Sequence, residues 1–239
     1  MIQKVIHGEC LEELSKIEDN SVNLILTDLP FGVTQNHWDC IIPLDSLWKE
    51  YYRIAKKNAA IVLNAMQPFT SILICSNLKD FKYNWIWHKS RPSGHLNAKR
   101  QPLREHEDVC IFYRKQPIYN PQFTKGAENH VNNKPHTKSQ SSNYGQQYEI
   151  IEEKTNEKYP KSILPFTVVS PSNVLHPNQK PLPLCEYMIK TYTNEGDLVL
   201  DSTCGSGTTL LAAKNLNRQF IGIEQNKEYY DIILERLKV

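Results

Sequence analysis

The feature that most constrains the fold is a glycine turn near the C-terminus. Residues 198–201 (Leu-Val-Leu-Asp) have the pattern of an apolar strand, residues 204–207 (Cys-Gly-Ser-Gly) that of a turn, and residues 208–216 that of a helix. Only 39 residues run from Asp201 to the C-terminus, which is enough for two strands and two helices. A doubly wound sheet needs more strands, so the others must come from the N-terminal part and the order is circularly permuted.

The turn also predicts what the chain binds. A second strand, residues 220–224, ends at Glu224, 19 residues past Gly205, and an acid there can bond the hydroxyls of a ribose. The third glycine of the dinucleotide pattern is missing because position 210 is Leu, and no Gly-Lys-Ser/Thr follows. Asp201 would repel a pyrophosphate but suits a cationic sulfonium ligand that carries an ammonium group. The unit therefore favours S-adenosylmethionine over NAD, and a purely structural turn is the alternative.

The rest of the chain is typical of an α/β fold. Strand patterns cover residues 4–7, 22–27, 60–64, 84–88 and 108–113, and helical spacing covers residues 11–17, 44–56, 71–78, 181–192 and 227–237. Asn226 is in the position of an N-cap for the last of these helices. Strands that alternate with helices predict a parallel sheet with helices on both faces.

A polar segment interrupts this pattern. Residues 116–170 are rich in Asn, Gln, Lys, Ser and Tyr and poor in aliphatic side chains, so they cannot build a core of their own. We expect one α/β domain made of residues 1–115 and 171–239, with 116–170 inserted as a long functional loop.

Composition narrows the class of protein. The longest apolar runs, such as residues 59–65, are too short to span a membrane, and no signal peptide is expected at the N-terminus, so the expected location is the cytoplasm. None of the six cysteines forms a C-x-x-C pair, so we expect no metal site. The net charge is +2, but residues 86–138 carry ten Lys/Arg against four Asp/Glu. This local excess could meet a phosphate backbone or form an ordinary solvated surface.

The tetrapeptide Asp28–Phe31 (Asp-Leu-Pro-Phe) follows a buried strand, where open α/β sheets place their ligands. The amine of adenine is a poor nucleophile because its lone pair is delocalised into the ring. A carboxylate that accepts a hydrogen bond from this amine localises the lone pair, and a neighbouring aromatic ring can stack on a base taken out of the duplex. Alone, the tetrapeptide is only a strand end and a turn; the glycine turn strengthens the catalytic interpretation.

Together these motifs resemble the β-class DNA amino-methyltransferases, in which a catalytic D-P-P-Y-type motif precedes the target-recognition region and the cofactor motif. The matches are residues 27–32 (Thr-Asp-Leu-Pro-Phe-Gly), 176–181 (His-Pro-Asn-Gln-Lys-Pro) and 201–209, with weaker ones at 6–10 and 106–113. They span almost the whole chain outside 116–170, which the resemblance identifies as a target-recognition insertion. The implied fold is a Rossmann-like methyltransferase sheet in permuted order.

The resemblance implies roles for individual residues. Asp28 and the carbonyl of Leu29 would hold the target amine, Pro30 would stiffen the turn, and Phe31 would stack on the base. Lys180 would lie near the carboxylate of the cofactor, and Glu9 with Cys10 would flank its adenine. The implied S-adenosylmethionine site comprises Glu9, Cys10, Asp28, Lys180, Asp201, Thr203, Cys204, Gly205, Ser206, Gly207, Thr208, Thr209 and Glu224.

The sequence departs from the family motif at three positions. Leu29 replaces the first proline, Phe31 replaces the usual tyrosine, and Glu9 replaces a usual aspartate. The loss of one proline predicts a less rigid catalytic turn. The acceptor and the stacking ring are retained, so we expect activity.

Double-stranded DNA is the expected substrate, methylated at N6 of adenine, because family members with Asp at the first motif position mostly act on adenine. The N4 amine of cytosine, RNA or a protein amide, and a catalytically weak DNA-binding subunit are alternatives. No proline is followed by cysteine, which argues against methylation at carbon 5 of cytosine. The resemblance also implies two further partners, a second copy of the chain in a homodimer and a cognate restriction endonuclease.

Expected DNA contacts lie after the fourth strand, and residues 33–39 could close over the flipped base. Basic side chains there would meet phosphates. They are Lys89, Arg91, Lys99, Arg100 and Arg104.

Overall fold

The computed structural model describes residues 2–32, 40–126, 156–170, 172, 174–176 and 178–238. It divides into two compact units, one of Met1–Asn120 with Ser162–Val239 and one of Pro121–Lys161. The predicted loop at residues 33–39 lies outside the described residues, as does most of the predicted insertion (residues 127–155).

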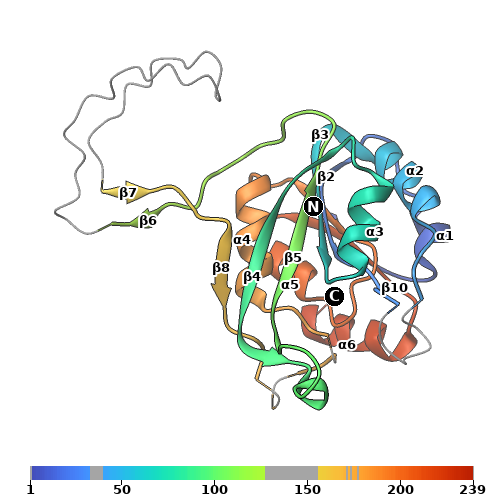
Figure 1. Cartoon of the computed structure of the whole chain (residues 1–239). Helices are drawn as coiled ribbons and strands as arrows, with labels where there is room; N and C mark the ends of the chain where they lie inside the picture. Colours follow the sequence, from blue (N-terminus) through green and yellow to red (C-terminus); the bar gives the residue numbers. More distant parts are fainter. Residues whose placement is uncertain are drawn as a thin grey trace. The chain divides into compact units, whose positions relative to one another are not determined.

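The larger unit is built on an eight-stranded sheet with the order β1-β10-β9-β2-β3-β5-β4-β8 (Figure 1). The N-terminal strand β1 pairs with β10 from the C-terminal end, and β9 lies between β10 and β2. This interleaving of the two ends of the chain confirms the permuted order. The strands are β1 (Gln3–His7), β2 (Val22–Asp28), β3 (Ala55–Ala65), β4 (Phe81–Ser93), β5 (Arg104–Phe112), β8 (Ile163–Phe166), β9 (Leu198–Asp201) and β10 (Gln219–Glu224).

The sheet is mixed, so the expectation of a parallel sheet is wrong for part of it. The pairs among β1, β10, β9, β2 and β3 are parallel, whereas β5 runs antiparallel to both β3 and β4. The cause is a hairpin, because β4 and β5 are joined through a short 3₁₀ turn (His95–Asn97) preceded by Gly94 at φ 92°. A connection this short can only join antiparallel strands.

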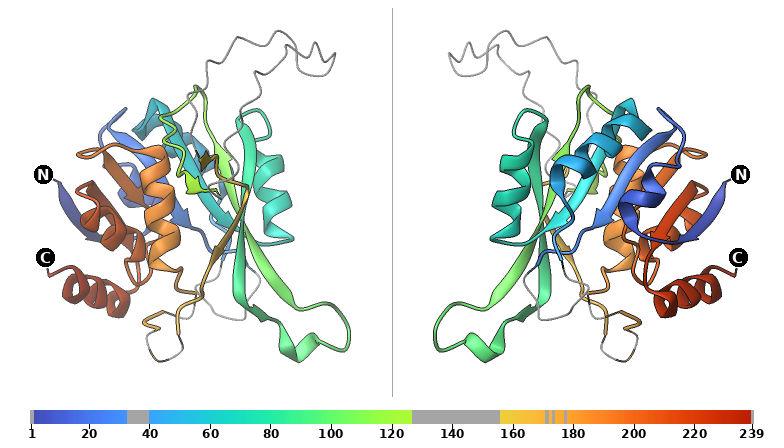
Figure 2. Two further views of the ribbon diagram at one scale, coloured as in Figure 1. Left: turned by 90° about the vertical axis from the view of Figure 1, so that its left-hand side faces the viewer. Right: turned by 90° about the vertical axis from the view of Figure 1, so that its right-hand side faces the viewer.

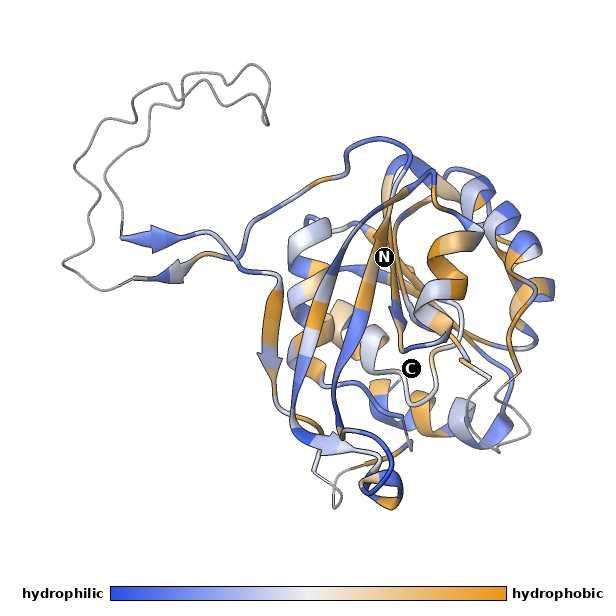
Figure 3. Cartoon of the chain, viewed as in Figure 1, coloured by the Kyte–Doolittle hydropathy of each residue, from blue (hydrophilic) through white to orange (hydrophobic). Residues whose placement is uncertain are grey.

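Six helices cover the two faces of the sheet (Figure 2). One buried cluster contains side chains of α1 (Cys10–Leu14), α2 (Leu44–Ile54) and α3 (Phe69–Ser76), and a second contains those of α4 (Leu182–Tyr192), α5 (Thr208–Asn215) and α6 (Lys227–Leu237). Alternate residues of β2 serve the two clusters, Ile25 the first and Leu24 and Leu26 the second. Figure 3 shows the resulting hydrophobic colouring of the central strands.

Several element ends are explained by local hydrogen bonds. Asn226 caps α6 as expected, since its Oδ1 accepts from the backbone N–H groups of Glu228 and Tyr229 at 2.8 and 3.3 Å. Helix α2 ends at Ile54, two residues earlier than predicted, because β3 begins directly at Ala55. Near that end, the Arg53 guanidinium donates to the carbonyls of Leu14 and Ile17 at 2.7 Å each, which ties α2 to the end of α1.

The smaller unit contains one antiparallel pair, β6 (Thr124–Lys125) with β7 (Glu157–Lys158). The rings of Phe123 and Tyr159 lie 4.9 Å apart beside it. Strand β8 falls within the predicted insertion but pairs with β4 in the main sheet. The role of residues 116–170 in target recognition stays a prediction. No helix in the described ranges is long and apolar enough to cross a membrane.

Gly222 in β10 is expected to be indispensable for packing. A Cβ there would lie 2.3 Å from Cδ1 of Leu210 and 3.1 Å from Sγ of Cys204. We expect Gly222→Ala to lower the free energy of unfolding by about 1–3 kcal/mol, because it overpacks a closed core. Urea denaturation measures this loss. Leu210→Ala in the same protein removes the side chain that the added methyl group would meet, so it should relieve the clash. If the two losses simply add in the double variant, the steric account is wrong.

Candidate active site

Acidic residues gather where four neighbouring parallel strands end. Glu9 follows β1, Glu224 ends β10, Asp201 ends β9 and Asp28 ends β2. They border a cavity of about 760 Å³. Of the predicted site residues, the cavity is lined by Glu9, Cys10, Asp28, Leu29, Pro30, Phe31, Lys89, Arg91, Arg104, Lys180, Asp201, Thr203, Cys204, Gly205, Ser206, Thr208, Thr209 and Glu224, and not by Gly207, Lys99 or Arg100.

The glycine turn is fixed by Glu224. One oxygen of this carboxylate accepts from the backbone N–H of Gly205 at 2.8 Å and the other from that of Asn226 at 2.8 Å. Burial raises the pKa of Glu224, although these backbone hydrogen bonds oppose the shift. Gly207 has φ +74°, a conformation that L side chains rarely adopt, and it starts α5. The predicted unit of strand, glycine turn, helix and acid therefore folds as one braced structure.

Asp201 is more deeply buried than a ligand contact alone would require. The residue is only 3 % exposed, and its carboxylate accepts a hydrogen bond from the Thr27 hydroxyl at 2.7 Å. Burial raises its pKa to about 6, against hydrogen bonds from Thr27, Thr209 and Thr203 that favour the ionised form. Asp201 thus joins β9 to β2 in addition to lining the cavity.

The turn formed by residues 28–31 is anchored on both sides. Thr203 donates from its hydroxyl to the carbonyl of Asp28 at 3.0 Å. The Leu29 side chain is 3 % exposed and packs in the cluster under α1–α3, so this departure from the family motif adds core contacts. Phe31 stacks on Phe69 with ring centroids 5.4 Å apart.

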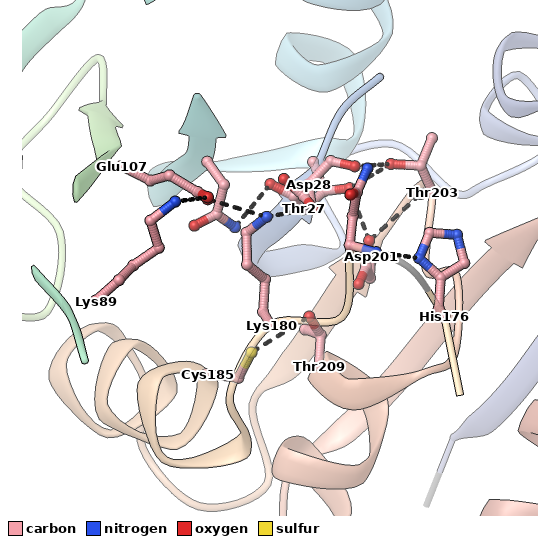
Figure 4. Close-up of polar contacts among 12 residues, drawn as sticks. Thr27, Asp28, Lys89, Glu107, His176, Lys180, Cys185, Asp201, Thr203 and Thr209 are labelled. Atoms are coloured by element: carbon pink, nitrogen blue, oxygen red, sulfur yellow. Dashed lines mark hydrogen bonds and ion pairs between the residues drawn. The ribbon is translucent and has the colours of Figure 1, made fainter. Parts of the chain in front are cut away.

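Asp28 is the first of four charged side chains that contact one another in a row (Figure 4). Lys180 Nζ lies 2.6 Å from Oδ2 of Asp28 and 3.2 Å from Oε2 of Glu107, and Lys89 Nζ lies 3.1 Å from Oε1 of Glu107. Burial alone would lower the pKa of Lys180, but the charges of Asp28 and Glu107 outweigh it and raise the pKa. Burial would raise the pKa of Glu107, but Lys180 and Lys89 lower it. The pKa shifts of Lys180 and Glu107 thus both favour the charged forms of these two groups.

One lysine lies elsewhere than the sequence suggested. Lys89 was expected on the surface facing phosphates, but it is 6 % exposed and paired with Glu107, because it belongs to the inward-facing set of β4 with Trp87. Lys180 lines the cavity and forms ion pairs with Asp28 and Glu107, and its place beside the cofactor stays a prediction. Glu107 was missed as a site residue because the first half of β5 is polar throughout (Arg-Glu-His-Glu-Asp), so the sequence does not mark this acid as buried.

The remaining predicted residues occupy two regions. Glu9 accepts from the backbone N–H of Glu12 at 2.9 Å and caps α1, while burial raises the pKa of the Cys10 thiol to about 12. The predicted DNA contacts other than Lys89 are exposed and lie on the β4–β5 hairpin; they are Arg91, Lys99, Arg100 and Arg104.

His176 also borders the cavity and was not assigned a role. Its ring packs against Tyr229 with centroids 4.4 Å apart, and a Cβ on Gly205 would lie 3.6 Å from it. Burial, helped by the charge of Lys180, lowers its pKa to about 4, so it is neutral at pH 7. Within the described residues no group of three or more His, Cys, Asp or Glu side chains could hold a metal ion.

The donor set of the cavity fits S-adenosylmethionine. Glu9, Asp201 and Glu224 supply acidic groups suited to an ammonium and to ribose hydroxyls, and the Gly205 backbone permits close approach. Ile42 and Val169 add apolar wall beside these groups.

Comparison with known proteins places the chain in a family. The family model described as DNA methylase matches residues 22–235. The chain belongs to the DNA methylase family. It is a DNA methyltransferase that uses S-adenosylmethionine, and its α/β sheet is of the Rossmann-like methyltransferase type.

Individual relatives agree over almost the full length. The DNA adenine methyltransferase YhdJ of Escherichia coli K12 is 30% identical over 257 residues, which cover 98% of this chain and 82% of that protein. The type II methyltransferase M.HpaI of Haemophilus parainfluenzae is 28% identical, over 99% of this chain and 74% of its own.

Two solved structures have the same architecture. The M1.HpyAVI–SAM complex superposes with a TM-score of 0.66 at 26% identity and covers 99% of this chain and 100% of that one. The PvuII DNA methyltransferase, described as cytosine-N4-specific, has a TM-score of 0.70 at 18% identity, over 99% of this chain and 86% of its own. At that identity the second likeness concerns the fold alone.

The buried carboxyl of Asp201 makes the enzyme's stability depend on pH. Because its folded-state pKa lies above the ordinary value of 3.8, its contribution to stability is fully present below pH 4 and is lost as the pH rises through about 6. Asp201→Asn should therefore gain stability relative to wild type between pH 4 and pH 7. Urea midpoints at several pH values measure the difference, with exposed Asp231→Asn as the control. A difference that stays constant with pH would refute the assignment.

Proposed function

We propose that this enzyme methylates the N6 amine of adenine in double-stranded DNA. The observation that carries the proposal is the place of Asp28, which is paired with Lys180 at the wall of the cavity, one strand away from the glycine turn. An aspartate at this position is commoner among adenine-methylating members of the family it resembles. The relative YhdJ, described as a DNA adenine methyltransferase, supports the same base.

In this mechanism the catalytic turn holds the amine and raises its reactivity. Asp28 accepts a hydrogen bond from the target NH₂, the carbonyl of Leu29 accepts the second, and Phe31 lies against the base. The Lys180 ammonium lies 2.6 Å from Oδ2 of Asp28, and in this ion pair the carboxylate is the acceptor. The segment from Asp201 to Thr209, with Glu224, would hold S-adenosylmethionine, which supplies an electrophilic methyl group on a cationic sulfur.

Methylation at N4 of cytosine is the second candidate. Cytosine also presents an exocyclic amine whose lone pair is delocalised into the ring, and the same pair of acceptors would serve it. The PvuII enzyme, described as cytosine-N4-specific, has the same fold, so the fold does not exclude this base.

The DNA would be held by the β4–β5 hairpin. Arg91 and Arg104 line the cavity, and Lys99 and Arg100 lie exposed near its 3₁₀ turn. Basic side chains beside the cavity would bind phosphates of the strand that carries the target base. Lys89 is left out of this set because it is buried against Glu107.

We also propose that the enzyme belongs to a restriction–modification pair, because its relative M.HpaI is a type II methyltransferase. A cognate endonuclease, a homodimer and a cytoplasmic location belong to this proposal.

Analysis of the methylated nucleosides tests the proposed base. Plasmid DNA incubated with enzyme and S-adenosylmethionine should yield N6-methyladenine when digested and analysed by mass spectrometry. Asp28→Asn should lower kcat by about 100-fold or more, because it removes a preorganised charged acceptor. Its affinity for S-adenosylmethionine, measured by calorimetry, should change by less than about threefold.

The possible outcomes distinguish the alternatives. If the product is N4-methylcytosine, the target base is cytosine and the adenine proposal is wrong. A fully active Asp28→Asn variant would remove Asp28 from the mechanism, and faster methylation of RNA or protein than of DNA would overturn the substrate class.

Removal of the hairpin charges should weaken DNA binding in a salt-dependent way. Each phosphate contact contributes about 0.9 to the slope of log K against log salt, so the double variant Lys99→Ala/Arg100→Ala should flatten that slope by about 2. Fluorescence anisotropy at several salt concentrations measures it. Lys79→Ala/Lys82→Ala is the matched control, because these exposed lysines lie at the opposite end of β4. Equal slopes for both double variants would exclude the hairpin as a phosphate-binding surface.

A further inference from the structure

We propose that Glu107 and Lys89 are positioning residues that fix the Lys180 ammonium and, through it, the orientation of Asp28. This inference rests on the proposed function, in which Asp28 accepts the target amine. It assigns a task to a buried acid and a buried base that the mechanism above does not use.

Strand geometry brings the two residues to the site. Strand β5 runs antiparallel to β3, so its first residues lie at the edge where the parallel strands end, and Glu107 is one of them. Glu107 is opposite Trp87 in the β4–β5 pairing, and Lys89 follows Trp87 by two residues on the same face. Lys180 precedes α4, which covers that face. Three separate segments thus bring their charged ends to one point (Figure 4).

Burial makes each of these contacts necessary. The exposed fractions of the side chains are 7 % for Lys89, 13 % for Glu107 and 8 % for Lys180. A buried ion without a partner is strongly unfavourable, so an ammonium at Lys180 needs its carboxylates close by. The row has two positive and two negative groups, Asp28 included, and its net charge is zero.

The same arrangement restricts Asp28. Lys180 Nζ lies 2.6 Å from Oδ2 of Asp28 and is held from the other side by Glu107 at 3.2 Å. Without Glu107 the ammonium would be held from one side only, so it could shift together with the Asp28 carboxylate and turn that carboxylate away from the amine. A displacement of about 1 Å at a reacting group can lower the rate about 100-fold.

A purely structural role is the alternative to be excluded. In that case Glu107 would stabilise the sheet as any buried ion pair does, and its loss would lower stability without a specific effect on turnover. Asp108 provides the matched control, since it is the next residue, is also buried, and points to the other face, where it accepts from the Thr70 hydroxyl at 2.8 Å.

The experiment compares Glu107→Gln, Lys89→Met, the double variant Lys89→Met/Glu107→Gln, and Asp108→Asn. Turnover is measured on DNA as labelled methyl incorporation, and each value is corrected for the folded fraction. Glu107→Gln should lower kcat about 10- to 100-fold, with the affinity for S-adenosylmethionine within about twofold of wild type. Lys89 acts on Lys180 only through Glu107, so the double variant should lose no more than about twofold in kcat beyond Glu107→Gln alone, and it should not recover toward wild type.

The results separate this inference from the proposed function. Unchanged kcat in Glu107→Gln, a double variant that returns to the kcat of wild type, or an equal loss in Asp108→Asn would each overturn the positioning role. Activity that survives Asp28→Asn would instead overturn the mechanism at Asp28. The comparison of kcat values holds whichever base is methylated.

Discussion

The seam between β2 and β9 is the contact on which the fold depends. It joins segments about 174 residues apart in sequence, yet its register has only two residue pairs, Leu24 with Val199 and Ile25 with Leu200. Side chains extend it at both ends. Asn23 donates to Asp197 at 2.7 Å and accepts from the Leu198 N–H at 3.1 Å, and Thr27 donates to Asp201 at 2.7 Å. Polar residues at the strand ends thus complete a short apolar seam.

Local patterns predicted the helices and strands well because their apolar residues are the ones buried in the core. The predicted strand at residues 198–201 and helix at 227–237 are confirmed to the residue, and the permuted order followed from how little chain remains after Asp201. The direction of β5 could not be predicted in the same way. Apolar alternation has the same period in parallel and antiparallel strands, so only the hairpin at Gly94 could have revealed it.

That one missing direction explains most of what was missed at the site. Had β5 run parallel to β3, its first residues would lie at the opposite edge of the sheet, far from Asp28. Glu107 therefore has no visible role in a parallel interpretation. The tetrapeptide and the glycine turn needed no such information, since both follow parallel strands. Leu29 is similar: burial in the core is a tertiary property that the motif alone does not reveal.

The separation between the ends of β2 and β9, where Asp28 and Asp201 lie, is set by the sheet itself. Asp28 and Asp201 end adjacent strands, and neighbouring strands lie about 4.8 Å apart. Thr203 donates to the Asp28 carbonyl, and its hydroxyl oxygen lies 2.9 Å from that of Thr27, so the turns after β2 and β9 are fastened to each other. This spacing depends on which strands are neighbours and not on the order in which the chain visits them. A permuted chain can therefore hold donor and acceptor in the same relation, provided that the seam forms.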